Sequence, residues 1–353
     1  MMQCKRCIND DSVRSISFDE EGVCNYCRKF DEIKEKILNY QKLEKMFQTR
    51  VDKVRGKHQY DVAVGISGGK DSVYVLDQLL KKHHLKVKAF TMNNGFLTEE
   101  AKKNIDRLVN EYGVEHEYID YEQELLRRVY HYSMKHFLVP CVACSYVGYA
   151  SMIGYAAKID AGMCVHGRSP EQMLRYYDSD MFSTLLKLGL KDTDDFDLDK
   201  EYIKLFRELE HKADKGLFEE VRKAALGDLE KGNFREFVPY YLYHEYDEGR
   251  IVEYLKANTG WRPPKKYDHY DCEIQEAAKY IYQCAEGRPH ILPEISVLIR
   301  MSKITREDGL KRLESAWIDK KPKEKLTKLC NTANVSQAAV LTKAKIYNKI
   351  IRK

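Results

Sequence analysis

The feature that most constrains the fold is an apolar strand that runs directly into a glycine-rich loop and a helix. Residues 61–66, DVAVGI, are a short apolar run, the loop SGGKDS spans 67–72, and apolar residues recur with helical spacing up to residue 84. Strand-like and helix-like segments then alternate as far as residue 167. This alternation predicts a parallel sheet with helices on both faces and a ligand outside the carboxyl ends of its strands.

The periodicity of the sequence divides the chain into four parts. In the α/β part we expect strands at 61–66, 86–92, 115–120 and 161–167, and helices at 70–84, 98–113, 121–137 and 147–160, with VPCVACSY at 139–146 interrupting the pattern. Beyond residue 180 the pattern is helical, with an acidic connector at 191–202 and many tyrosines that we expect to pack in the interior. The predicted parts are a metal ribbon at 1–30, a linker helix at 31–57, the α/β domain at 58–180 and a helical substrate or assembly region at 181–353.

Two CxxC pairs, separated by sixteen residues, open the chain. So small a segment cannot bury a core of its own, and four thiolates around one Zn²⁺ would supply the missing folding free energy. The alternative is a redox-active dithiol pair, which is weaker because no βαβ pattern surrounds either CxxC. The pattern predicts a structural zinc ribbon held by Cys4, Cys7, Cys24 and Cys27.

The glycine loop has the composition of a phosphate site. It lies at the start of a helix, where backbone N–H groups lack partners and the helix dipole favours an anion. The two glycines let the backbone approach the ligand, the lysine adds positive charge, the serines offer hydroxyls, and the aspartate can help to hold Mg²⁺. These predicted ligands are Ser67, Gly68, Gly69, Lys70, Asp71 and Ser72.

The loop resembles the SGGxDS signature of the PP-loop, or N-type, ATP pyrophosphatases, whose domain is of the adenine nucleotide α-hydrolase type. The resemblance implies that the β,γ-pyrophosphate of ATP binds there and that AMP is transferred to a substrate oxygen, with Lys70 and Asp71 as catalytic residues. It also places Asn93 or Asn94 near the ribose or the substrate, although a turn explains these asparagines equally well. After the fourth strand, His166 and Gly167 reach the same sheet edge, and Arg168 is either an α-phosphate ligand or a surface arginine.

Over most of its length the chain is similar to one PP-loop family, the N-acetyl sugar amidotransferases. The matching segments are the cysteine ribbon, VGISGGKDSVYV, YDEGRIVEYLKANTGWRPP, HYDCEI and EISVLIRMSKITREDGLKRLE. This resemblance implies that adenylation of a sugar carboxyl or acetamido oxygen is followed by replacement with nitrogen. It also implies a separate glutaminase partner that supplies ammonia.

A third CxxC, at Cys141 and Cys144, departs from that family and is reminiscent of PP-loop sulfur transferases. In those enzymes a CxxC at this place and one distant cysteine hold a 4Fe-4S cluster with one iron free. Cys272 is then the expected third ligand and Cys164 the second choice, whereas a further zinc or unliganded buried cysteines are the alternatives. Nitrogen transfer and sulfur transfer to tRNA or a metabolite share the adenylation step and differ in the nucleophile. His269 beside Cys272 is interpreted as a packed or surface residue rather than a ligand.

The composition indicates which substrates and surfaces the protein is expected to contact. With 60 basic and 55 acidic residues the net charge is +5, which favours a small, sugar-like substrate over tRNA. The sequence contains no apolar run long enough for a membrane span and no signal-peptide pattern, so we expect a cytoplasmic enzyme without membrane contact. A homodimer is a further expectation. A non-catalytic nucleotide sensor is the alternative from another class, and release of pyrophosphate distinguishes it from an enzyme.

Overall fold

A computed structural model describes residues 2–13, 16–169, 171–172, 215–227, 235–263 and 271–351. The acidic connector at 191–202, the predicted boundary at residue 180 and His269 lie outside these residues. No helix of the described ranges has the length and apolar character that crossing a bilayer requires.

Five parallel strands form one sheet in the order β3-β2-β1-β4-β5. After β3 the chain returns to the other side of β1, so the direction of winding reverses between β1 and β4. In parallel sheets a ligand binds at such a switch point, outside the carboxyl ends of the strands. The strands are β1 (Tyr60–Gly65), β2 (Val87–Met92), β3 (Glu115–Ile119), β4 (Ala161–His166) and β5 (Glu236–Pro239).

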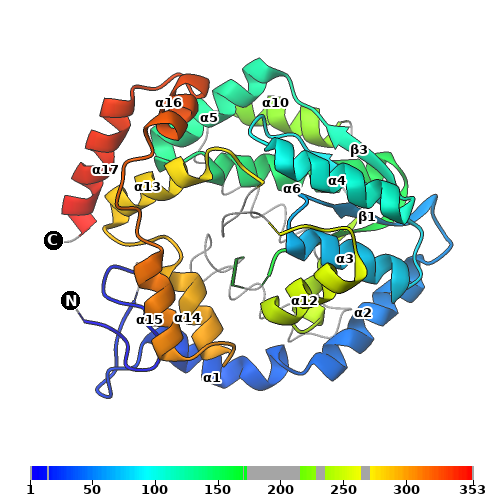
Figure 1. Ribbon diagram of the computed structural model, residues 1–353, viewed down its shortest axis with the longest axis horizontal. Coiled ribbons are helices and arrows are strands. Elements are labelled where there is room, and N and C mark those ends of the chain that lie inside the picture. The colour runs from blue at the N-terminus through cyan, green and yellow to red at the C-terminus, as the bar shows by residue number, and fades with distance from the viewer. Residues whose placement is uncertain are drawn as a thin grey trace.

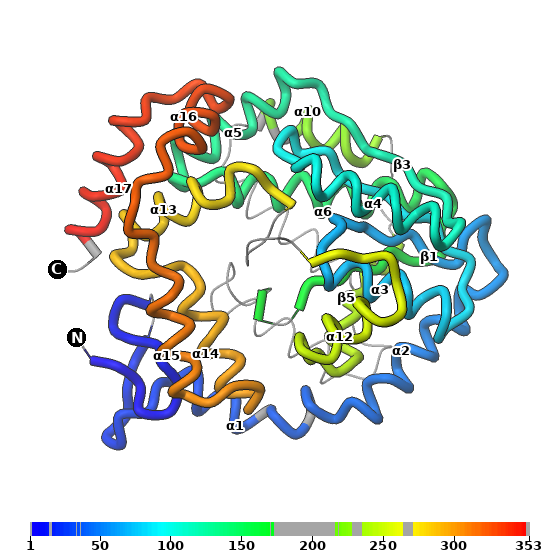
Figure 2. Tube along the Cα trace, viewed as in Figure 1, coloured from blue at the N-terminus to red at the C-terminus, as the bar shows by residue number. Residues whose placement is uncertain are grey.

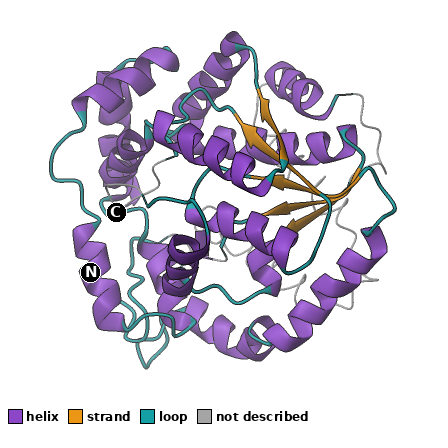
Figure 3. Cartoon of the chain, turned by 45° about the vertical axis from the view of Figure 1, so that its right-hand side comes forward, coloured by secondary structure: helices purple, strands orange, loops and turns teal. Residues whose placement is uncertain are grey.

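Helices cover both faces of the sheet (Figure 3). One apolar core joins the sheet to α2, α3, α4 and α12, and the opposite face packs against α6 and α10. The helices around the sheet are α2 (Tyr40–Val54), α3 (Lys70–Lys81), α4 (Glu99–Tyr112), α5 (Gln123–Phe137), α6 (Cys141–Lys158), α10 (Lys215–Leu226), α11 (Tyr240–Tyr243) and α12 (Glu248–Asn258). The expected doubly covered α/β fold is confirmed.

The C-terminal helices form a second layer that returns to the N-terminus (Figure 1). They are α13 (Gln275–Glu286), α14 (Leu292–Arg300), α15 (Arg306–Ser315), α16 (Lys323–Thr332) and α17 (Gln337–Ile351). Figure 2 shows the N-terminal segment beside α14 and α15. There Ile8 is buried with Leu292 and Ile295, while α1 (Asn25–Ile37) leads from the ribbon towards the sheet.

Three elements differ from the sequence-based expectation. The linker expected as one helix at 31–57 is two helices, α1 and α2, because the Asn39 side chain accepts from the backbone N–H of Lys42 and starts a new helix. The CxxC at 141–144 does not interrupt the pattern but forms the first turn of α6. The strand β5 joins the sheet from the region expected to be helical almost throughout. Four residues of edge strand leave too little periodicity to detect.

The tyrosines of the predicted aromatic segment are core residues, as expected. Tyr240, Tyr241 and Tyr243 are almost completely buried against α2 and α3. The Tyr241 hydroxyl reaches the backbone of the glycine loop and donates to the carbonyl oxygen of Asp71 at 3.0 Å. The segment after β5 therefore holds the backbone of the glycine loop through this hydrogen bond.

Candidate functional site

The glycine loop connects the end of β1 to the start of α3, as the sequence predicts. Gly68 has a φ of +76°, and a Cβ there would lie 2.9 Å from the carbonyl oxygen of Ala101, so both conformation and space require glycine. Ser72 Oγ accepts from the backbone N–H of Ser67 at 3.2 Å and donates to the carbonyl oxygen of Gly69 at 3.1 Å. The backbone N–H of Gly69 lies 3.4 Å from Ser67 Oγ. These bonds hold the loop in one conformation at the first turn of α3.

Charged side chains surround the loop. Lys70 Nζ lies 3.1 Å from Asp71 Oδ2 and 3.4 Å from Glu248 Oε1. Burial opposes the charge of Lys70, but the two carboxylates outweigh it and raise its pKa above the usual value. Burial raises the pKa of Asp71, although Lys70 opposes that rise. The result is a cation held at the loop with a buried carboxylate beside it.

A second buried carboxylate, Glu171, interacts electrostatically with Asp71. Burial raises the pKa of Glu171 to about 8, and the charge of Asp71 contributes to this rise. Asp71 Oδ1 and Glu171 Oε2 are buried and have no hydrogen-bond partner among the described residues. Unpartnered buried acceptors of this kind fit a cation. Sequence reasoning did not predict Glu171, because a lone glutamate after SP carries no motif.

The end of β4 adjoins the loop through Gly167. A Cβ at this position would lie 2.9 Å from the carbonyl oxygen of Asp71 and 3.0 Å from Cα of Ser72, so the two segments meet backbone to backbone. His166 is buried and stacked on Phe237, with ring centroids 4.4 Å apart, and burial lowers its pKa to about 3. The structure therefore brings Gly167 to the loop and keeps His166 neutral.

Arg168 turns towards α6. Its guanidinium donates to the Tyr149 hydroxyl, and a second nitrogen lies 3.3 Å from Ser145 Oγ. Its charge also acts on the thiol of Cys144 and opposes the rise in that group's pKa caused by burial. The two side-chain hydrogen bonds to Tyr149 and Ser145 therefore join Arg168 to α6, where Ser145 directly follows the CxxC.

The asparagines after β2 have different surroundings. Asn93 donates to Asp120 Oδ1 at 2.7 Å and accepts from the backbone N–H of Gly95 at 3.2 Å, which is a turn role. Asn94 Nδ2 lies 3.9 Å from the sulfur of Cys144. The Asn94 side-chain oxygen also accepts from the backbone N–H of Phe96 at 2.8 Å, so a turn explains both asparagines, and Asn94 in addition contacts Cys144.

Three cysteines from two remote segments lie beside one tyrosine. Burial raises the pKa of Tyr130, and the charges of Cys144, Cys272 and Cys141 raise it further. The Tyr130 hydroxyl lies 3.8 Å from the Cys144 sulfur and donates to the carbonyl oxygen of Asn94 at 2.7 Å. We call Cys141, Cys144 and Cys272 the cysteine trio.

A backbone pairing brings Cys272 to the CxxC. Cys272 forms an antiparallel bridge with Leu97, and the backbone N–H of Glu273 donates to the carbonyl oxygen of Phe96 at 2.9 Å. Burial raises the pKa of Cys272, and the charges of Cys144 and Cys141 act on it as well. Cys164, the second choice as third ligand, is instead fully buried within β4 on the face covered by α6.

The spacing of the cysteine trio differs from that of the N-terminal cysteines. Within the described ranges, the one group of three or more potential ligands whose atoms all lie within 4.8 Å of one another is Cys4, Cys7, Cys24 and Cys27. The sulfurs of the trio do not all lie within this distance of one another.

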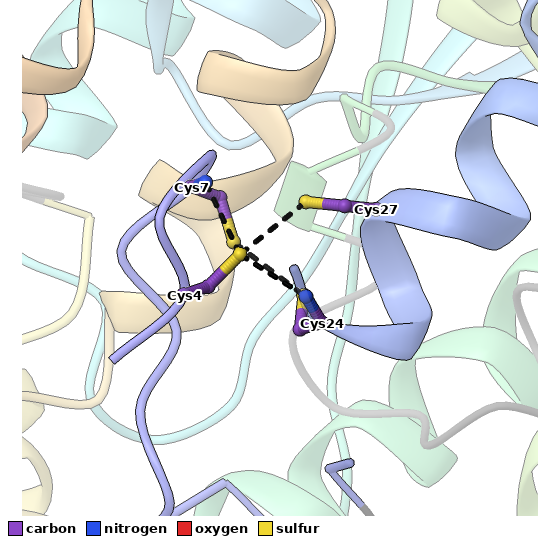
Figure 4. Close-up of side chains that lie close together, drawn as sticks. All are labelled: Cys4, Cys7, Cys24 and Cys27. Atoms are coloured by element: carbon purple, nitrogen blue, oxygen red, sulfur yellow. Dashed lines mark hydrogen bonds between the residues drawn. The ribbon is translucent and has the colours of Figure 1, made fainter. Parts of the chain in front are cut away.

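The four N-terminal cysteines fit one tetrahedral ion (Figure 4). All four are completely buried, with Cys4 and Cys27 sulfurs 3.9 Å apart and Cys7 and Cys24 sulfurs 3.7 Å apart. Zn–S bonds of roughly 2.3 Å in a tetrahedron place neighbouring sulfurs about 3.8 Å apart. The donor set and its spacing therefore match a single thiolate-bound ion.

Asp271 is a further site residue that sequence reasoning missed. Burial raises the pKa of this carboxyl, while interaction with the Ser67 side chain opposes the rise. Its charge acts on the thiols of Cys144 and Cys272 and raises their pKa values. No local signal marks it, because the pairing that fixes its backbone joins segments about 175 residues apart.

No protein-family model and no curated protein matches the chain. Among solved structures, a U34-tRNA thiolase from Methanococcus maripaludis with its 4Fe-4S cluster is 15% identical, with a TM-score of 0.36 and coverage of 90% of each chain. An NH3-dependent NAD synthetase from Campylobacter jejuni subsp. jejuni, in complex with a nitrate ion, is 18% identical, with a TM-score of 0.27 and coverage of 53% of this chain and 93% of its own. Because both TM-scores are low, the fold assignment rests on the strand order of this chain itself.

Proposed function

We propose that the protein is an ATP-dependent adenylating enzyme of the PP-loop type that transfers sulfur to the carbon it activates. The observation that supports this proposal is the meeting of two groups at one sheet edge. The glycine loop follows β1, and Asn94, which follows the neighbouring parallel strand β2, contacts Cys144 of the cysteine trio, so both groups lie at the carboxyl ends of adjacent strands. Nitrogen transfer, which the resemblance to amidotransferases implies, needs no cysteine at this place.

The loop and its surrounding charges are suited to hold the phosphates of ATP. The backbone donors of the first turn of α3 and Lys70 would bind the pyrophosphate end. Asp71 and Glu171 would hold Mg²⁺, because their free oxygens are buried acceptors without a partner in the described chain. A substrate oxygen then attacks the α-phosphorus, pyrophosphate leaves, and the oxygen becomes part of AMP, a good leaving group.

The cysteine trio would hold an iron–sulfur cluster. Three thiolates satisfy three irons of a 4Fe-4S cluster, and such a cluster supplies sulfur-transfer chemistry because one iron keeps no protein ligand. Asn94 and Tyr130 are hydrogen-bond donors beside Cys144 and would stabilise its thiolate. We further propose a small, sugar-like acceptor, a sulfur-donor protein as partner, and Zn²⁺ in the N-terminal ribbon.

The first test is adenylation. Purified protein with ATP, Mg²⁺ and a carbonyl acceptor is expected to release pyrophosphate. K70A and D71A should each lose at least a hundredfold in rate, because K70A removes a cation that neutralises phosphate charge and D71A removes a ligand of the Mg²⁺ that does so. K81A, at the far end of α3, is the control. Nucleotide binding without pyrophosphate release would support a sensor instead, and an active double alanine variant would refute the loop assignment.

The second test is the colour of the protein. Anaerobically purified protein is expected to be brown, with absorption near roughly 400 nm that C141S, C144S and C272S each abolish. C284S, on α13 but outside the trio, should keep it. Colourless protein that contains zinc alone would contradict sulfur transfer and favour nitrogen as the incoming atom.

A further inference from the structure

The peptide bond between Gly68 and Gly69 is held from outside the loop by a tryptophan. The indole Nε1–H of Trp261 donates to the carbonyl oxygen of Gly68 at 3.2 Å, although the two residues are 193 positions apart in the chain. The Trp261 side chain is buried, so this bond is shielded from water. One buried donor from a remote segment therefore contacts the backbone of the glycine loop.

This peptide bond is the part of the loop that most needs such a restraint. It has glycine on both sides, and residues without a Cβ allow the peptide plane to turn over at little steric cost. Such a flip moves the φ of the second residue to positive values, as the change from a type I to a type II turn does. Gly69 has a φ of −74°, and its backbone nitrogen lies 3.4 Å from Ser67 Oγ. The bond to Trp261 selects this orientation over the flipped one.

The orientation of the peptide decides which of its atoms meets a phosphate. In a planar trans peptide the carbonyl oxygen and the following N–H point in opposite directions. Because the Gly68 carbonyl is bonded to Trp261, the Gly69 N–H points to the other side, towards Ser67 Oγ and away from the indole. A flipped peptide would present its carbonyl oxygen there instead, and the partial negative charge of that oxygen would repel an anion.

The backbone on both sides of Trp261 is fixed by α4. Three side chains from one face of this helix, spaced three and four residues apart, bond to it. The three bonds join Glu111 Oε2 to the N–H of Gly260 at 2.6 Å, Arg107 to the carbonyl oxygen of Gly260 at 3.2 Å, and Asn104 to the carbonyl oxygen of Arg262 at 3.1 Å. Trp261 is thus placed by the same helix whose Ala101 carbonyl limits the space at Gly68.

We propose that Trp261 is a positioning residue for phosphate binding, whose indole N–H keeps the Gly68–Gly69 peptide turned so that the N–H of Gly69 faces the anion. In this role the indole acts through the peptide plane and not by contact with the phosphate. This inference rests on the proposed function in that the loop binds the pyrophosphate end of ATP. It adds to the site a residue that lies far outside the glycine motif.

The first measurement is the affinity for Mg²⁺–pyrophosphate, which fills the loop without a nucleoside. We expect W261F to bind it about tenfold more weakly than the wild-type protein, because phenylalanine keeps an aromatic ring in the same place but donates no hydrogen bond. W317F, the same substitution at the other tryptophan of the chain, which is 44% exposed, is the matched control. An affinity of folded W261F within twofold of the wild-type value would overturn the proposal.

A mutant cycle separates this role from a general structural one. A flipped peptide needs a positive φ at residue 69, which alanine strongly disfavours, so G69A blocks the flip even when the indole N–H is absent. In the observed conformation an added Cβ would lie 3.3 Å from Ser67 Oγ, the end of a side chain that can rotate. Whatever G69A alone does to the affinity, W261F should weaken it by less than twofold on that background. A full tenfold loss there would show that Trp261 supports the site without orienting the peptide, and would overturn the proposal.

The indole N–H of Trp261 also gives a readout in the wild-type protein. When a phosphate accepts from the Gly69 N–H, the carbonyl of the same peptide becomes a stronger acceptor, because hydrogen bonds in a chain polarise one another. In ¹⁵N-labelled protein, Mg²⁺–pyrophosphate should therefore move the NMR signal of the Trp261 indole proton downfield, while the Trp317 signal, identified by its loss in W317F, stays in place. An unmoved Trp261 signal at saturation would contradict the proposal. Wild-type protein that binds no pyrophosphate would refute the loop assignment itself, whereas a failure confined to Trp261 leaves the proposed function standing.

Discussion

Single residues at this site differ in how clearly the sequence marks them. The loop residues from Ser67 to Ser72 belong to one contiguous pattern, whose strand-to-helix context predicts their chemistry. Asp271 and Glu171 are lone carboxylates, and only their burial beside the loop indicates a role. Burial matters because a charged group deprived of water is costly unless a partner or a cation compensates it.

Burial also fixes the protonation state of a histidine away from the loop. His244 is stacked on Tyr240 with ring centroids 3.8 Å apart, and it contacts Phe47 edge-on. Burial lowers the pKa of His244 to about 3. Below about pH 6.5 the unfolded chain binds a proton at this histidine and the folded protein does not. The contribution of neutral His244 to the unfolding free energy is therefore complete above about pH 6.5 and is lost as the pH falls towards 3.

We predict that H244F reduces the acid sensitivity of folding. Phenylalanine keeps the stacking but has no proton to bind, so between pH 6.5 and pH 5 the variant should lose about 2 kcal/mol less unfolding free energy than the wild-type protein. Urea unfolding at the two pH values measures the difference. H136F, which replaces an exposed histidine stacked on Tyr132, should show the wild-type pH dependence. If the unfolding free energy of H244F fell by as much as that of the wild-type protein between the two pH values, the neutral state assigned to His244 would be contradicted.

At the scale of elements, the site depends on how closely β4 approaches α3. Gly167 follows β4, and its Cα has no room for a side chain beside the backbone of Asp71 and Ser72. Both neighbouring atoms are backbone, so neither can rotate away from an added methyl group. The loop would have to move instead, and its donors would move with it.

G167A is therefore expected to weaken ATP binding at least tenfold and to lower the unfolding free energy by about 1–3 kcal/mol. Calorimetric titration with a non-hydrolysable ATP analogue and urea unfolding are the measurements. The control is G148A in α6, where an added Cβ would lie 3.7 Å from the sulfur of Met92, an ordinary contact. Wild-type affinity in G167A would show that the loop tolerates displacement.

At the scale of the whole molecule, the N-terminal cysteines connect the two ends of the chain. Arg300 of α14 is buried and its guanidinium lies 3.7 Å from the Cys7 sulfur. Arg306 of α15 donates to the carbonyl oxygen of Cys7 at 3.1 Å and to Gln3 Oε1 at 2.8 Å. Four thiolates around a divalent ion carry net negative charge, which these arginines partly neutralise.

Loss of the ion should therefore destabilise both the N-terminal segment and the helices α14 and α15 that contact it. In C24S, which cannot complete the tetrahedron, we expect amide hydrogen exchange to rise in residues 2–30 and in α14 and α15, because Arg300 becomes a buried cation without a counter-charge. Amides of β1 and β2 should exchange as in the wild-type protein, and C284S is the matched control. Unchanged protection in α14 would show that these helices hold together without the ion.

The sequence by itself determined what depends on neighbours along the chain. The alternation of β1, α3, β2, α4, β3, α5 and β4 follows from local periodicity, and the glycine loop and the four-cysteine ribbon follow from residues a few positions apart. It also nominated Cys141, Cys144 and Cys272 as one group, although by resemblance and not by spacing.

Only the tertiary structure decided which remote segments meet. The pairing of residues 271–273 with 96–98 brought Cys272 beside the segment that follows β2, β5 extended the sheet, and Arg168 turned towards α6. Such contacts depend on backbone pairing and burial between parts of the chain far apart in sequence. Periodicity cannot encode them, because it records the environment of a residue and not the identity of its distant partner.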